Sequence, residues 1–185
     1  MTQTLAPSLT LEEFLERPET KPALEYINGN IVEKNMPQGE HSLLQGELCE
    51  VINRVARSPK IARAFPELRC TFGRRSMVSD IAVFRWERIP RTDTGKIANR
   101  FELHPDWAIA ILSPNQSSSQ ALDKLLYGSQ SGTSLGWLIN PAEESIWAIG
   151  ENQRIEVFTT DAQLPVLEGI DLELTVSEIL SWLIL

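Results

Sequence analysis

The sequence has the composition of an ordinary globular protein, with 185 residues of which 42% are hydrophobic and 23% charged. This length fits one domain, and we expect a flexible N-terminus over residues 1–9 followed by a single domain over residues 10–185. The net charge of −8 argues against a protein that coats nucleic acid non-specifically, since that role needs a positive surface.

The cysteines and the apolar runs suggest a location inside the cell. Cys49 and Cys70 are too few for a disulfide framework and lack the spacing of a zinc site, so we expect reduced, buried thiols. Apolar runs such as residues 107–112 are too short to span a membrane, and the N-terminus has no signal peptide. The sequence therefore predicts a cytoplasmic protein with no membrane partner.

Three elements are expected in the first third of the chain. Thr10-Leu-Glu-Glu13 is a capping box, which predicts the start of a short helix. The Asn28-Gly29 pair between apolar residues predicts a β-hairpin. Apolar residues at helical spacing then predict a helix over residues 41–57 with one buried face.

The middle of the chain predicts strands. Residues 68–72 and 77–86 have strand composition and are joined around Gly73. Residues 88–100 contain a proline, a glycine and several basic residues, and are expected to form a loop. Residues 107–112 are almost wholly apolar, which is typical of a central strand covered on both faces.

The C-terminal third predicts a helix ending near Gly132, then an apolar strand over residues 135–139. Residues 145–149 and 154–158 are expected to pair as strands. A second capping box, Thr175-Val-Ser-Glu178, predicts a last helix. Because helices and strands alternate along the chain, the order is that of a mixed α/β domain.

Basic residues gather in one part of this acidic chain. From Arg69 to Arg100 there are eight basic and three acidic residues, a net charge of +5, which leaves −13 for the remainder. Such a segment can face phosphates, although a solvated loop with no specific role is the alternative. The candidates for nucleic-acid contacts are Arg74, Arg75, Arg88 and Arg91.

Asp80 is the strongest candidate for chemistry, because it lies in an otherwise apolar strand. A buried carboxylate is costly unless it is paired or binds a metal, so Asp80 is either a ligand, a solvent-facing edge residue, or the partner of Arg74 or Arg75. No nucleophile elbow or glycine-rich phosphate loop is present. Carboxylates such as Asp80 favour a hard divalent cation. Glu40, taken alone, is better explained as a negative charge at a helix N-terminus, where the helix dipole favours it.

Five segments, in this order and spacing, together resemble the Uma family. This is a family of endonuclease-like proteins, abundant in cyanobacteria, with the PD-(D/E)xK core of restriction endonucleases. The resemblance implies a mixed β-sheet flanked by helices, with an N-terminal helix and β-hairpin added to that core. The segments are Leu24–Glu33, Gln38–His41, Val78–Val83, Pro105–Pro114 and Gly136–Pro141.

The resemblance also implies a site that has lost part of its chemistry. Asp80 matches the family's metal-binding aspartate, and Ala110 stands where the family's next strand carries a glutamate. Lys124 matches a lysine that this family carries on the following helix, and Glu40 matches an acidic residue of the first core helix. Asp80 and Glu40 are thus the implied metal ligands, and Asp80, Lys124 and Glu40 the implied catalytic residues.

Two further departures lie near the implied site. Ser79 replaces the proline that usually precedes the aspartate, and Asn140 replaces an aspartate common before Pro141. Together with Ala110, these departures favour a non-catalytic module on the same scaffold. The loss of the glutamate alone would weaken catalysis, because the loss of a group that touches the reacting atoms commonly costs at least ~100-fold in rate.

The resemblance implies an endonuclease that cleaves DNA with Mg²⁺ or Mn²⁺ and acts as a homodimer, with the metal weakly bound and cleavage impaired by Ala110. The alternative is a non-catalytic module on the same fold, which binds nucleic acid or another protein. Metal-dependent nicking of DNA would separate the first reading from the second.

Overall fold

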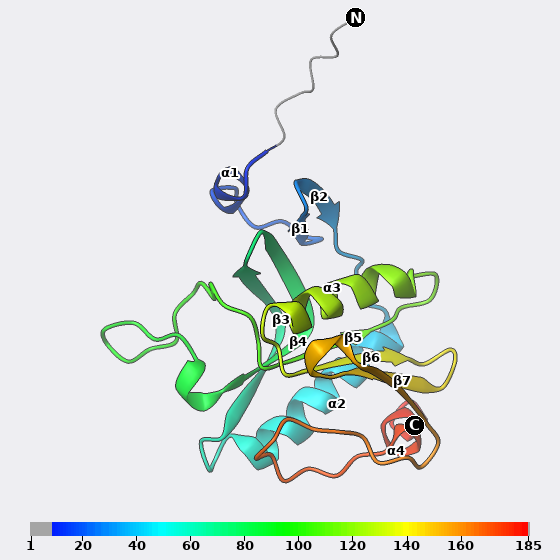
Figure 1. Cartoon of the computed structure of the whole chain (residues 1–185). Coiled ribbons are helices and arrows are strands. Elements are labelled where there is room, and N and C mark those ends of the chain that lie inside the picture. The colour runs from blue at the N-terminus through cyan, green and yellow to red at the C-terminus, as the bar shows by residue number, and fades with distance from the viewer. Residues whose placement is uncertain (1–8, 185) are drawn as a thin grey trace, which may run out of the picture.

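The computed structural model describes residues 9–184, so most of the N-terminus predicted to be flexible lies outside the described residues. The strands are β1 (Leu24–Ile27), β2 (Asn30–Glu33), β3 (Ala62–Phe72), β4 (Arg75–Arg85), β5 (Trp107–Ile111), β6 (Leu135–Asn140), β7 (Ser145–Ile149) and β8 (Ile155–Thr159). The helices are α1 (Leu11–Leu15), α2 (Gly39–Ala56), α3 (Ser118–Gln130) and α4 (Val176–Ser181), with short 3-10 turns η1 (Trp86–Arg88) and η2 (Glu151–Gln153) (Figure 1).

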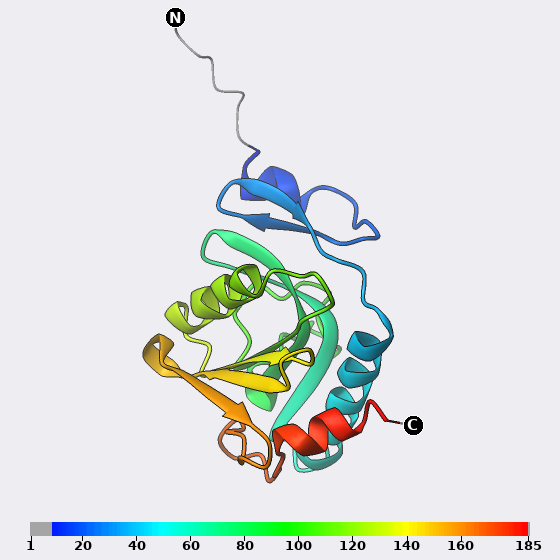
Figure 2. The ribbon, with the colours of Figure 1, turned by 90° about the vertical axis from the view of Figure 1, so that its right-hand side faces the viewer.

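The strands form one mixed sheet in the order β2-β1-β4-β5-β6-β7-β8, with β3 paired to β4. Strands β5 and β6 are parallel and are joined through α3, whereas the other neighbours are antiparallel. Helix α3 covers one face of the sheet, and α2 and α4 lie on the other side (Figure 2). The predicted mixed α/β fold with flanking helices is therefore confirmed.

Alternation along β5 explains this layering. Trp107, Ile109 and Ile111 pack into the larger core under α2 and α4, while Ala108 and Ala110 face the smaller cluster under α3. A strand that presents apolar side chains to both faces must be covered on both faces. The small alanines on the α3 side leave room for a cavity there.

The N-terminal elements form as the local sequence predicts. Thr10 caps α1 with a reciprocal capping box, and Thr175 does the same for α4. Asn28 and Gly29 both have positive φ, as the two-residue turn of the β1–β2 hairpin requires. The hairpin lies at the end of the molecule opposite α4 (Figure 2).

The long hairpin of β3 and β4 differs from the prediction at its start. Strand β3 begins at Ala62, whereas the sequence predicted a strand from residue 68. Pro66 and Glu67 hide the strand pattern, because proline is rare inside strands and Glu67 has a positive φ of 46°. The ladder nevertheless keeps its register on either side, so Glu67 lies opposite Asp80.

One edge of β4 is shared between two strands that do not meet. Ser76 pairs with Tyr26 of β1, and Ile81 to Val83 pair with β5. Residues 77–80 lie between these two contacts, and the sheet opens there. No helix within residues 9–184 is long and apolar enough to cross a membrane.

Candidate functional site

A cavity of about 350 Å³ lies where the sheet opens along β4. Asp80 of β4, Ala110 of β5 and Lys124 of α3 all line it, so the fold brings together three of the residues singled out from the sequence. Glu40 does not line it; its side chain is exposed in the first turn of α2. Of the sequence-derived candidates, Asp80 and Lys124 are therefore the ionisable groups that share the cavity.

Asp80 is buried and both of its carboxylate oxygens are engaged. Oδ2 accepts the backbone N–H of Ile111 at 2.7 Å, so the carboxylate completes the ladder where β4 and β5 separate. Oδ1 accepts the ammonium of Lys34 at 2.7 Å and lies 3.3 Å from Nε2 of His41. The sequence suggested Arg74 or Arg75 as an ion-pair partner; that suggestion is wrong, because the partner is Lys34 from the chain that follows the N-terminal hairpin.

The pKa of Asp80 reflects these neighbours. Burial alone raises the pKa of the carboxyl, but the neighbouring His41 imidazole, the Lys34 ammonium and the Ile111 N–H outweigh it and hold the pKa below its usual value. Asp80 is therefore an anion in the folded protein and needs a cation beside it.

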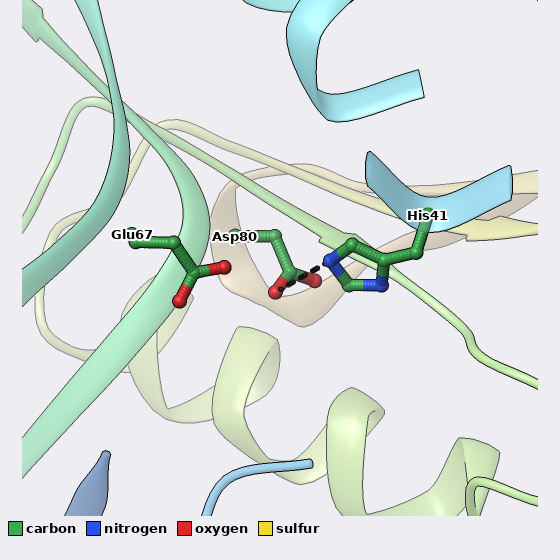
Figure 3. Close-up of side chains that lie close together, drawn as sticks. All are labelled: His41, Glu67 and Asp80. Carbon is green, nitrogen blue, oxygen red and sulfur yellow. Dashed lines mark ion pairs between the residues drawn. The ribbon is translucent and has the colours of Figure 1, made fainter. Parts of the chain in front are cut away.

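His41, Glu67 and Asp80 form a compact group of potential metal ligands, with one ligand atom of each within 4.8 Å of the others. They come from α2, β3 and β4, and their polar ends converge (Figure 3). Nε2 of His41 is buried and faces Oδ1 of Asp80 at 3.3 Å, while its Nδ1 lies 3.2 Å from Oγ of Ser113. The sequence missed Glu67, because its approach to Asp80 depends on strand register.

Lys34 lies between the two carboxylates of this group. Its Nζ donates to both oxygens of Glu67, at 2.9 and 2.7 Å, and to Oδ1 of Asp80 at 2.7 Å. Its side chain is only 12% exposed. Burial lowers the pKa of Lys34, but the charges and hydrogen bonds of Asp80 and Glu67 outweigh this and raise the pKa above its usual value.

A second, part-buried ion pair lines the same cavity. The Lys124 ammonium donates to Glu25, whose side chain is fully buried in β1 and whose other oxygen accepts the Val78 N–H at 2.8 Å. The side-chain amide of Gln45 likewise donates a hydrogen bond to the backbone carbonyl of Asp80, at 2.7 Å. Side chains thus complete the backbone hydrogen bonds of β4 where the sheet opens, as buried polar groups require. Glu25 lies inside the hairpin motif and was not singled out from the sequence.

Ala110 marks the wall next to Asp80. The β4–β5 register ends at Ile81 and Ile109, and one further step would set Asp80 opposite Ala110. The strands separate at this step, so the two residues are not a ladder pair, but a glutamate at position 110 would bring a second carboxylate into the cavity that Asp80 lines. Ser79 also lines the cavity, whereas Oδ1 of Asn140 accepts the Glu143 N–H at the end of β6.

The four arginines singled out for nucleic-acid contacts do not form one patch. Arg75 is buried and pairs with Asp123 at 2.7 Å, and Arg88 pairs with Asp106 at 2.6 Å. Arg74 is exposed at the β3–β4 turn, and Arg91 is exposed beyond the other end of β4. An 11-residue strand spans roughly 35 Å, so these two exposed arginines lie far apart.

Comparison with known proteins decides the family. The family model Uma2, described as "Putative restriction endonuclease", matches residues 11–177. The chain belongs to the Uma2 family. A solved structure, described as a "putative nuclease belonging to DUF820" from Anabaena variabilis, is 50% identical, with a TM-score of 0.92 over 95% of this chain and 99% of that chain. No curated protein matches the chain.

The metal that restriction-endonuclease-like proteins commonly use does not fit this Uma2 site as it stands. The oxygens around Lys34 Nζ lie 2.7 to 2.9 Å from it, which suits an ammonium, whereas Mg²⁺ binds oxygen at about 2.0–2.1 Å. Both oxygens of Asp80 are already used, and Ala110 offers no ligand. His41, Glu67 and Asp80 have ligand atoms that suit a divalent cation, but the Lys34 ammonium already binds two of these residues, Glu67 and Asp80.

Proposed function

We propose that this Uma2 protein is a Mg²⁺-dependent DNA endonuclease of the PD-(D/E)xK type whose cleavage is impaired because Ala110 replaces a glutamate. The observation that carries the proposal is the position of Ala110, on the cavity wall beside Asp80 and in the same cavity as Lys124. An aspartate, a lysine and the fold of the family are kept, while one carboxylate is missing.

The missing carboxylate has a chemical consequence. Hydrolysis of a phosphodiester by this type of enzyme needs a cation that activates water and offsets the charge that builds on the phosphate. Asp80 is the proposed ligand that remains, and the exposed Glu40 is a weaker candidate because it does not line the cavity. Lys124 is the proposed residue for orienting water, and here its ammonium is held by Glu25.

DNA is the proposed substrate. The proposed location is the cytoplasm. Arg74 and Arg91 are the proposed phosphate contacts, because Arg75 and Arg88 are engaged by carboxylates. Two copies of the chain would be needed to cut both strands, since each copy offers one cavity with Asp80 and Lys124. The proposed active form is therefore a homodimer, in which each copy has one exposed arginine at each end of β4 to contact the DNA backbone.

Cleavage of supercoiled plasmid with Mg²⁺ or Mn²⁺ tests this proposal. We expect Ala110→Glu to nick the plasmid at least ~100-fold faster than the unchanged protein, because it restores a carboxylate beside Asp80. Ala110→Gln is the matched control, with the same size and no charge, and should stay as slow as the unchanged protein. Adding Asp80→Asn to Ala110→Glu should abolish the gain.

If Ala110→Glu folds and does not nick in either metal, the nuclease proposal loses its support. The remaining reading is then the non-catalytic module on the same fold. That reading is favoured by the Lys34 contacts, which close the site, and by the part-buried ion pair that holds Lys124.

A further inference from the structure

The ammonium of Lys34 lies between two of the three candidate ligands, Asp80 and Glu67. We propose that Lys34 is the built-in cation of this site: its Nζ takes the position between Asp80 and Glu67 that a divalent cation would take, so the unchanged protein needs no metal there and excludes it. This inference rests on the proposed function in one respect only, which is that the ion Lys34 replaces is a divalent cation. The position of Lys34 itself is established by its contacts with Asp80 and Glu67.

The hydrogen bonds of Lys34 are complete. A lysine ammonium has three N–H donors, and the three oxygens nearest Nζ are the two of Glu67 and Oδ1 of Asp80. All three distances lie in the range of charge-assisted hydrogen bonds. No donor is left over, so the ammonium is a full occupant of this position.

The backbone holds Lys34 in place. Its N–H donates to the carbonyl of Ala23 at 2.8 Å, which extends the β1–β2 hairpin by one residue beyond Glu33. Tyr26 of the same hairpin pairs with Ser76 of β4. The lysine is therefore anchored to a strand that is itself anchored to β4, and its side chain reaches along the cavity to Asp80.

Charge explains why a cation is required at this position. Asp80 and Glu67 lie opposite each other on β4 and β3, and Glu67 keeps a positive φ of 46° that most residues avoid. Two carboxylates held this close repel each other unless a cation lies between them. Lys34 supplies that cation, and Gln45 adds a hydrogen bond to Glu67 at 2.9 Å.

Lys34→Gln tests the inference, with Lys96→Gln in the exposed loop before β5 as the matched control. In EDTA, we expect Lys34→Gln to lower the melting temperature by about 6–12 °C, because two carboxylates lose their cation. Electron paramagnetic resonance should then detect Mn²⁺ bound by Lys34→Gln and not by the unchanged protein. Saturating Mn²⁺ should restore most of the lost melting temperature.

The inference is overturned if the unchanged protein binds Mn²⁺ as tightly as Lys34→Gln, or if Lys34→Gln melts together with Lys96→Gln. Should Lys34→Gln fail to fold, the double change Lys34→Gln, Glu67→Gln removes the cation together with one anion. The double variant should then fold, and its failure to do so would also overturn the inference.

These measurements are separate from DNA cleavage. If Lys34→Gln gains Mn²⁺ while Ala110→Glu never cuts, the cation inference stands and the nuclease proposal fails. If Ala110→Glu cuts while the unchanged protein already binds Mn²⁺ beside Lys34, the nuclease proposal stands and the cation inference fails.

Discussion

Lys34 and Ala110 together set the charge beside the Asp80 carboxylate. A glutamate at position 110 would add a negative charge beside Asp80, and Lys34 now adds a positive charge at the same carboxylate. Both residues lower the need for a metal, since Ala110 offers no ligand and Lys34 neutralises the ligand that remains. Restoring metal-dependent chemistry therefore requires more negative charge at this point, which Ala110→Glu supplies on its own and Lys34→Gln would supply further.

The two cysteines give an independent test of burial at single residues. Burial raises the pKa of Cys70 to about 12 and that of the half-buried Cys49 to about 11. The reactive thiolate is therefore scarce at pH 8 and increases only as the pH rises toward these values.

We predict that Cys70 reacts with Ellman's reagent at pH 8 at least ~100-fold more slowly than a free thiol of ordinary pKa, about 8.5. A Cys49→Ser variant isolates Cys70, and a Cys70→Ser variant isolates Cys49, which should react faster. The control is the same reaction in guanidinium, where both thiols should react rapidly. Rapid reaction of Cys70 in the native protein would show that this part of the core is open.

The β3–β4 hairpin is the element on which the site depends. It carries Glu67 and Asp80 on opposite strands, and its turn packs on α3, the helix that carries Lys124. Tyr127 of α3 makes this contact, because its hydroxyl accepts the Arg74 N–H at 2.8 Å and donates to the Phe72 carbonyl at 3.2 Å. The turn needs Gly73, which has a positive φ of 59°.

We predict that Gly73→Ala lowers the free energy of unfolding by about 3 kcal/mol, combining left-handed strain with two lost hydrogen bonds. A Cβ at Gly73 would lie 2.1 Å from the Tyr127 hydroxyl, so the helix contact must shift. Gly95→Ala is the control, since Gly95 also has a positive φ but a Cβ there meets nothing within 4 Å. It should lose only about 1 kcal/mol.

Urea denaturation measures both variants. If Gly73→Ala and Gly95→Ala are equally stable, the Tyr127 contact contributes little and the hairpin is not held by α3. Circular dichroism should show the same helix content in both, because neither glycine lies in a helix.

At the scale of the whole molecule, the elements with strong local patterns were predictable. The Asn28-Gly29 turn, the capping boxes and the apolar run before Pro114 each encode their structure within a few residues, and all formed as expected. Asp80 was identifiable as well, because a carboxylate among apolar strand residues must have a partner.

The partners of Asp80 were not predictable from local patterns. Lys34 lies 46 positions from Asp80 in the chain, and Glu67 follows a proline that obscures its strand. Glu25 looked like part of an ordinary hairpin, although it is fully buried and holds Lys124. Such contacts depend on strand order and register, which arise only when distant segments pack together.

The basic stretch shows what a charge count along the sequence leaves open. Its eight basic residues were compatible with a phosphate-binding surface or with a solvated loop, and the fold spreads them along and beyond an extended strand. Arg75 and Arg88 then pair with carboxylates that lie outside the stretch. A charge excess along the sequence becomes a surface patch only when its residues share a face, and here they do not.

The most direct test of the closed site is a crystal structure of the unchanged protein grown with millimolar Mn²⁺, with anomalous diffraction data collected to locate the ion. We expect the Lys34 ammonium to lie between Asp80 and Glu67, within hydrogen-bond distance of both, and no anomalous peak within bonding distance of Asp80. An anomalous peak about 2.2 Å from Asp80, with Lys34 turned away, would contradict it.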